Sequence, residues 1–151
     1  ALLPTIPSVD ASIPNHRPHD PAETGGSAIQ EWERTYAVWT HRGTLIACVL
    51  AVCSIGIGFW APPVFAMFMW LNKRERSAFI DDHAREALNF AISLVIYSGI
   101  AFVAGFITLG LAWILFGPAL AILTFVGFLS ASRHANRGAY YRYPMCLRLV
   151  G

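Results

Sequence analysis

A row of polar residues runs through a segment of the chain that is otherwise largely apolar. Its members are separated by 4, 3, 4 and 4 positions, a spacing that places them on one face of a helix. We call this row the polar stripe, and it consists of Asp82, Glu86, Asn89, Ser93 and Tyr97. Lipid offers polar groups no hydrogen-bond partner, so the stripe must face protein or water. The spacing favours hydrogen bonds between helices, with Thr40, His41, Thr44, Ser130 and Ser132 as candidate partners, over a polar groove open to the cytoplasm.

Three histidines suggest a different chemistry, because imidazole nitrogens bind metal ions and haem iron. They are His41, His83 and His134. We expect each of them near a helix end, where a histidine is ordinarily solvated or caps the helix. No acidic residue repeats beside them at ligand spacing, so we predict no metal site and no cofactor. A histidine-dependent metal or haem protein remains a second alternative function.

Catalytic patterns of other kinds do not stand out in the sequence. We find no nucleophile–base pair, no phosphate-binding glycine loop and no paired carboxylates at a usable depth. The carboxylates of Asp81 and Asp82 are adjacent in the chain, so their side chains diverge and make a poor acid–base pair. The sequence therefore predicts that the protein has no catalytic residues and is not an enzyme.

The elements that must position these residues are apolar helices. Residues 43–72 and 87–132 contain no Asp, Glu, Lys or Arg, and the whole chain is 56% hydrophobic but only 13% charged. About 20 helical residues cross a hydrocarbon layer of about 30 Å. The second stretch therefore holds two crossings, and the first holds one long crossing or a tight hairpin. A net charge of +2 is too small to indicate nucleic acid binding.

The pattern predicts an all-α integral membrane protein with four hydrophobic helices. Glycines and prolines at Gly58–Pro63 favour a hairpin of the first two helices, because proline opens a helix more readily than it continues one. We expect the third helix to begin at Asp81 or Asp82, either of which is a good N-cap. The expected helices run from about Glu31–Glu33 to Ile57, from Pro62 to Asn72, from Asp81 or Asp82 to Leu109, and from Leu111 to Arg133.

Basic residues predict how these helices sit in the membrane. They gather in the loop Lys73–Arg76 and near the C-terminus, and Lys and Arg concentrate on the cytoplasmic side of membranes. Together with the hairpin, this pattern puts both termini in the cytoplasm. We predict a multi-pass protein of the bacterial inner membrane.

The chain divides into three predicted segments. Residues 1–30 are a proline-rich, extended arm, residues 31–134 are the four-helix transmembrane domain, and residues 135–151 are a basic and aromatic tail. We interpret the tail as an interfacial anchor, with a docking strand for a partner as the alternative. The side chains expected at the membrane interface are Trp32, Trp39, Arg42, Lys73, Arg74, Arg137, Tyr140, Tyr141, Arg142 and Tyr143.

Two short segments resemble a known family. One is His83–Phe90, similar to the family's H-x-x-x-A-L-N-F helix start, and the other is Ala135–Pro144, similar to its A-N-x-G-x-x-Y-x-Y-P ending. The family consists of small bacterial membrane proteins of unknown function, grouped with the channel-like small subunit of the chloroplast inner-envelope protein-import translocon. The resemblance covers roughly residues 31–150 and implies a four-helix membrane bundle with both termini cytoplasmic. It implies no reaction.

These observations lead to one preferred function and one main alternative. We predict a non-catalytic accessory or assembly subunit of a larger inner-membrane complex, held by its transmembrane helices and its N-terminal arm. The alternative is a small conduit or protein-translocation component whose path is lined by the polar stripe. The expected partners are the lipid bilayer and a larger membrane protein complex, and not nucleic acid.

Overall fold

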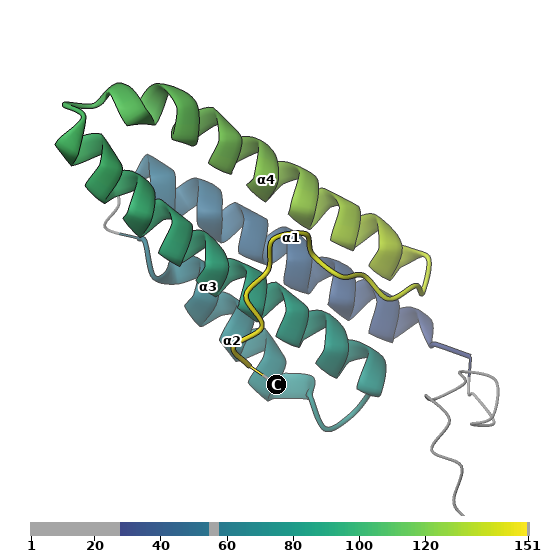
Figure 1. Ribbon diagram of the computed structural model, residues 1–151. Coiled ribbons are helices and arrows are strands. Elements are labelled where there is room, and N and C mark those ends of the chain that lie inside the picture. Colours follow the sequence, from purple (N-terminus) through teal and green to yellow (C-terminus); the bar gives the residue numbers. More distant parts are fainter. Residues whose placement is uncertain (1–27, 55–57, 151) are drawn as a thin grey trace, which may run out of the picture.

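The protein is a bundle of four helices in this computed structural model, which describes residues 28–54 and 58–150 (Figure 1). The described residues contain no strand. The predicted all-α architecture is therefore confirmed. The helices are α1 (Glu31–Cys53), α2 (Ala61–Lys73), α3 (Ala78–Ile107) and α4 (Leu111–Asn136).

Three of the helices are long and apolar enough to cross a membrane, namely α1, α3 and α4. Helix α2 has 13 residues and begins with Pro62 and Pro63 in its first turn, as the sequence predicted. At about 1.5 Å per residue it is shorter than a hydrocarbon layer of about 30 Å. The chain is thus a multi-pass membrane protein in which α2 is the shortest element.

Helix α3 begins earlier than predicted, and neither Asp81 nor Asp82 is its N-cap. That position belongs to Ser77, whose hydroxyl accepts a hydrogen bond from the backbone N–H of Ile80. Asp81 lies in the first turn instead, where a carboxylate favours the helix dipole, and it accepts a hydrogen bond from the indole N–H of Trp70 at 2.7 Å. In the sequence the adjacent acids Asp81 and Asp82 are a more conspicuous N-cap signal than Ser77.

Two other helix ends differ from the expectation. Helix α1 ends at Cys53 rather than Ile57, which lies outside the described residues. Helix α4 begins at Leu111 as predicted, after Gly110 in a left-handed conformation (φ 91°) that glycine adopts without strain. It continues to Asn136, so the predicted boundary after residue 134 falls inside this helix. The predicted arm lies almost entirely in residues 1–27, outside the described residues.

The helices are arranged as two antiparallel pairs. Figure 1 shows the α1–α2 and α3–α4 connections at one end of the bundle, and the start of α1, the α2–α3 loop and the end of α4 at the other. Helix α1 contacts all three other helices. This arrangement agrees with the predicted hairpin, which brings both ends of the helical domain to one side. That this side is cytoplasmic stays a prediction.

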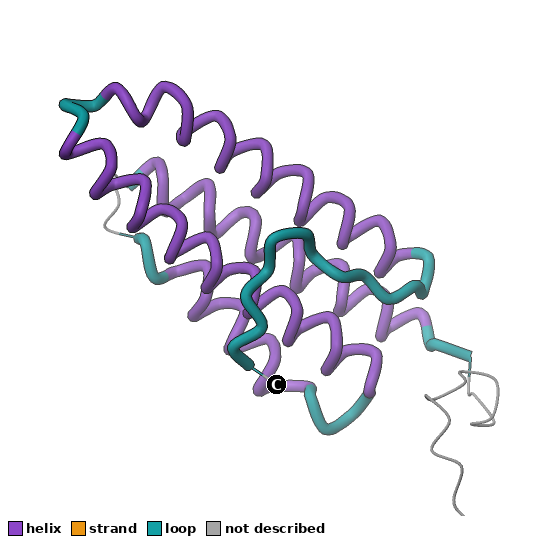
Figure 2. Tube along the Cα trace, viewed as in Figure 1, coloured by secondary structure: helices purple, strands orange, loops and turns teal. Residues whose placement is uncertain are grey.

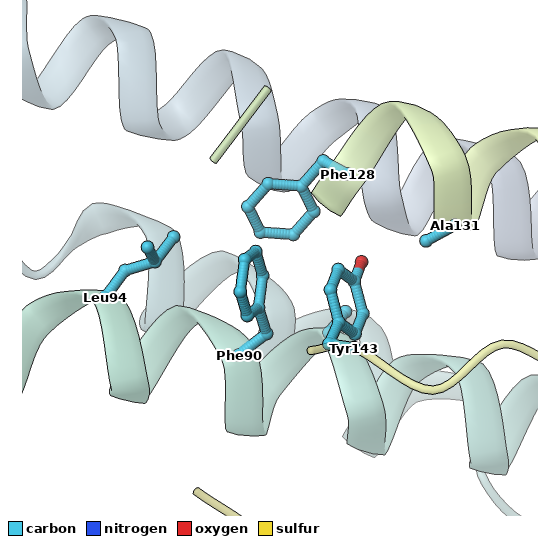
Figure 3. Packing of buried hydrophobic residues seen from close by; sticks show 6 residues of the cluster. Phe90, Leu94, Phe128, Ala131 and Tyr143 are labelled. Atoms are coloured by element: carbon cyan, nitrogen blue, oxygen red, sulfur yellow. The ribbon is translucent and has the colours of Figure 1, made fainter. Parts of the chain in front are cut away.

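The core lies between α3, α4 and the segment that follows α4. Figure 3 shows Phe90 of α3 between Phe128 of α4 and Tyr143, with the Tyr143 ring stacked on Phe90 at 4.2 Å between centroids. Phe90 and Phe128 meet edge to face at 5.1 Å. Because Tyr143 lies beyond the last helix, the C-terminal segment is part of the core.

Gly127 permits this aromatic packing, and we predict that Gly127→Ala destabilises the fold. An added Cβ would lie 2.8 Å from the Phe90 ring and 3.3 Å from the Tyr143 ring, and both rings are buried. We expect a loss of about 1–3 kcal/mol, typical of an overpacked core, measured as a lower denaturation temperature in detergent. The matched control is Gly99→Ala, where no heavy atom lies within 4 Å of the added carbon. Equal effects at both glycines would contradict this account.

Candidate functional site

The C-terminal segment after α4 folds back over the bundle, and we call residues 138–150 the strap. Figure 2 shows it as a non-helical tube that crosses the helices and returns toward the α2–α3 end. It leaves α4 through Gly138, which has a left-handed backbone (φ 70°). The turn is closed by a hydrogen bond from the Ala139 N–H to the His134 carbonyl at 2.9 Å.

The centre of the polar stripe binds the backbone of the strap. The side-chain oxygen of Asn89 accepts hydrogen bonds from the N–H groups of Leu149 at 3.1 Å and Val150 at 2.8 Å. Its side-chain nitrogen donates to the Val150 carbonyl at 3.0 Å. Asn89 is almost completely buried, so one amide group satisfies three backbone groups away from water.

The deeper members of the stripe continue this pattern. The Ser93 hydroxyl accepts a hydrogen bond from the Leu147 N–H at 2.8 Å and donates to the Asn89 carbonyl at 2.7 Å. The Tyr97 hydroxyl donates to the Met145 carbonyl at 2.7 Å. Irregular backbone is tolerated at membrane depth only where protein or trapped water supplies its hydrogen bonds. The stripe supplies them here.

The first two members of the stripe form ion pairs with the strap. Buried Glu86 accepts hydrogen bonds from Arg142 at 2.8 Å and Arg148 at 3.1 Å, and Asp82 pairs with Arg142 at 2.8 Å. Partial burial opposes the charge of Arg142, but the two neighbouring carboxylates outweigh it and raise the pKa of Arg142 above its usual value. The buried acid is therefore compensated by cations of the strap.

The stripe does bond to protein, as the sequence favoured, but its partner is the strap rather than another helix. The hydroxyls of Thr40 and Thr44 donate to carbonyls of their own helix, at Tyr36 and Thr40 respectively. Ser132 accepts a hydrogen bond from the Arg42 guanidinium at 3.1 Å. Thr40, Thr44 and Ser132, which were predicted to bind the stripe, therefore form hydrogen bonds with groups outside it.

Two of the three histidines are fully buried and touch each other, contrary to the prediction of solvated helix ends. His41 Nε2 lies 2.9 Å from His83 Nδ1, and His41 Nδ1 lies 2.8 Å from the Tyr143 hydroxyl. His83 Nε2 lies 3.2 Å from the Ala139 carbonyl. The strap contacts both rings, His41 through Tyr143 and His83 through Ala139, and so contributes to their burial. Burial also raises the pKa of Tyr143 well above its usual value, so this phenol keeps its proton.

The histidines do not form a three-ligand centre. His134 bonds instead to the Ser130 carbonyl of its own helix at 2.8 Å through Nδ1. Over residues 28–54 and 58–150, no group of three or more His, Cys, Asp or Glu side chains is placed to hold a metal ion. Nothing in this arrangement favours the metal or haem alternative.

The predicted interface anchors separate into two groups. Tyr143 is buried in the core and so is not the headgroup anchor that we expected, whereas Arg142 pairs with carboxylates but stays more than half exposed. Tyr141 packs against the same core and beside the His134 ring. Trp32, Trp39 and Tyr140 are exposed, Arg74 lies over the Trp70 ring, and Lys73 and Arg137 lie at the ends of α2 and α4. Their role at the interface stays a prediction.

The sequence alone does not reveal that the polar stripe binds the tail. The dense run of aromatic residues and arginines in residues 135–151 suggested a docking strand as the alternative, with another protein as its expected partner. The actual partner is the third helix of the same chain. The two segments that carried the family resemblance, 83–90 and 135–144, contact each other in this site through Glu86, Phe90, Arg142 and Tyr143.

Comparison with known proteins places this architecture in a family. No curated protein and no solved structure shows a significant match. Residues 32–150, which include the helices and the strap, match the MamF/MmsF family, described as a magnetosome magnetite crystal formation protein family. The match agrees with the expected family of small membrane proteins and carries no link to the chloroplast translocon. The chain belongs to the magnetosome magnetite crystal formation protein family.

Proposed function

We propose that this protein is a non-catalytic accessory subunit of a membrane complex that takes part in forming magnetite crystals. The observation that carries the proposal is the family match over residues 32–150, which spans the whole site. The proposed location is the bacterial inner membrane, with the membrane around the crystal as the other candidate.

The bonding of the polar stripe supports a non-catalytic role. The hydrogen-bonding groups of Asn89 and Ser93 are occupied by strap backbone, and Glu86 is occupied by two arginines. Side chains engaged in this way hold the chain together and are not free to bind a substrate. The same bonding argues against the conduit alternative, because a polar path needs side chains that face water.

The outer surface of the bundle supports an accessory role. Helix α4 exposes large apolar side chains along its length, among them Ile114, Leu115 and Ile122. Such a surface contacts lipid or the transmembrane helices of a partner. On this proposal the helices and the N-terminal arm together hold the protein in its complex.

Removal of the strap tests the proposal in cells. In a magnetite-forming bacterium lacking this gene, we expect the full chain to restore crystal size and number, measured by electron microscopy. A chain ending at residue 137 should restore neither, because Asn89 and Glu86 lose their partners and the bundle loses Tyr143. Wild-type crystals in the strain without the gene would contradict the proposed function.

Affinity purification of the tagged full chain from the same strain tests the accessory role separately. We expect a reproducible set of membrane proteins to co-elute, and deletion of residues 1–30 to weaken its recovery. Elution of the chain alone would contradict the accessory role. A cysteine at position 93, in a chain whose native cysteines are replaced by serine, tests the conduit alternative with Asn89 in place, since a water-soluble thiol reagent should reach it only if the stripe lines a path.

A further inference from the structure

We infer that His41 and His83 form a pH-sensitive latch that holds the strap at neutral pH and releases it on acidification. The inference rests on a series of hydrogen bonds that runs from the Ala139 carbonyl of the strap through His83 and His41 to the Tyr143 hydroxyl of the strap. The latch itself does not depend on the proposed function, whereas its link to mineral growth does.

The direction of each hydrogen bond follows from one carbonyl. The Ala139 carbonyl only accepts, so the proton of neutral His83 must be on Nε2, which leaves Nδ1 as an acceptor. His41 Nε2 then donates to that acceptor, and His41 Nδ1 in turn accepts the hydroxyl proton of Tyr143. The series is fully satisfied when both rings are neutral.

An additional proton has no place in this series. On His83 Nδ1 it would face the N–H of His41, with the two nitrogens only 2.9 Å apart. If His41 moves its own proton to Nδ1, that N–H faces the Tyr143 hydroxyl, whose proton then loses its acceptor. Either state also buries a positive charge in a site that excludes water.

The charged groups around the pair do not compensate such a proton. Glu86 of α3 is the nearest buried carboxylate, but Arg142 and Arg148 already neutralise it. Asp82 of α3 also pairs with Arg142, and that guanidinium opposes a second positive charge nearby. Other titratable groups that face the pair or lie on elements packed against it include His134 of α4, Arg42 of α1, Lys73 at the end of α2, and Tyr140 of the strap.

Release of the strap removes this obstacle, because Ala139 and Tyr143 leave together and water reaches both rings. In water a histidine binds its second proton below about pH 6.5. The released state therefore binds more protons than the held state, and acidification favours release. Between pH 7.5 and 5.5, each histidine that titrates in this way raises the ratio of released to held strap about tenfold.

Growth of magnetite gives such a latch a chemical input. The oxide ions of the mineral come from water, and each oxide ion taken from water leaves two protons behind. A strap that responds to protons would link the state of the protein to mineral growth nearby.

A distance measurement on the full chain in lipid nanodiscs tests the latch. Cys48, Cys53 and Cys146 are replaced by serine, His16 and His19 by glutamine, and nitroxide labels are placed at the exposed positions 145 and 122, on the strap close to Tyr143 and on α4. Pulsed electron resonance at pH 7.5 should show one short distance. At pH 5.5 a broad, longer population should grow, its ratio to the short one rising about tenfold or more.

Three variants assign the response to the latch. His41→Gln together with His83→Gln should abolish the pH dependence, and the single His41→Gln replaces the pair if the double variant does not fold. His134→Gln, the matched control, should keep the dependence. Tyr143→Phe should raise the released population at both pH values. The inference is overturned if the distance in the parent chain is the same at both pH values, or if the glutamine variants respond as the parent does.

Discussion

Asn89→Leu is expected to free the end of the strap while leaving the helices intact. Leucine has the same number of side-chain heavy atoms and the same branching at Cγ as asparagine, and a higher helix propensity, so α3 should persist. The substitution deprives Leu149 and Val150 of three hydrogen bonds. At about 1 kcal/mol each, their loss favours the open strap by about 3 kcal/mol, or roughly a hundredfold in population. Trypsin cleavage after Arg148 in the detergent-solubilised protein should accelerate by a similar factor.

The control for this experiment is Asn136→Leu, the same change at an exposed position at the end of α4. It should leave the cleavage rate within a factor of two or so of the parent, as surface substitutions generally do. If Asn89→Leu and Asn136→Leu are cleaved equally fast, the strap is not held by this amide.

Phe90→Ala is expected to be the most damaging single change in the bundle. The ring is fully buried and touches Phe128 of α4 and Tyr143 of the strap, so its removal leaves a cavity where three elements meet. Truncation of a buried phenylalanine costs about 3–5 kcal/mol. We expect a large fall in denaturation temperature in detergent together with faster cleavage of the strap.

Phe102→Ala is the matched control, because Phe102 lies on the same helix but points outward. It should cost little, since a lipid-like environment surrounds the ring before and after unfolding of the bundle. A double substitution adds a sharper test. Gly127→Ala should cost much less in the Phe90→Ala background, because the nearer of the two rings that the new Cβ meets is gone. Simple additivity of the two effects would mean that these residues do not touch.

The latch and the stripe act on different parts of the same strap. His83 and His41 hold its beginning through Ala139 and Tyr143, whereas Asn89 holds its end. Acidification should therefore loosen the beginning first, while Asn89→Leu loosens the end at every pH. Acidification of the Asn89→Leu variant is expected to release the strap more completely than acidification or the substitution alone.

The sequence by itself determined the helices of this protein. The uncharged stretches 43–72 and 87–132 require apolar helices because no soluble core of this size accommodates them, and the prolines at 62 and 63 determine where α2 begins. These features are local, since helix formation depends on residues within a few turns of each other. The polar stripe was likewise visible as a periodic pattern along one helix.

Only the tertiary structure decided what the stripe binds. Asn89 and Val150 are 61 positions apart, and their contact requires that α4 end beside the start of α3 and that Gly138 turn the chain back. The burial of His41 and His83 has the same origin, because the groups that contact the two rings come from the other helix and from the strap, far away in the sequence. The periodicity of polar residues in the sequence predicts which of them share a helix face. Which segment packs against that face depends on the packing of the whole chain.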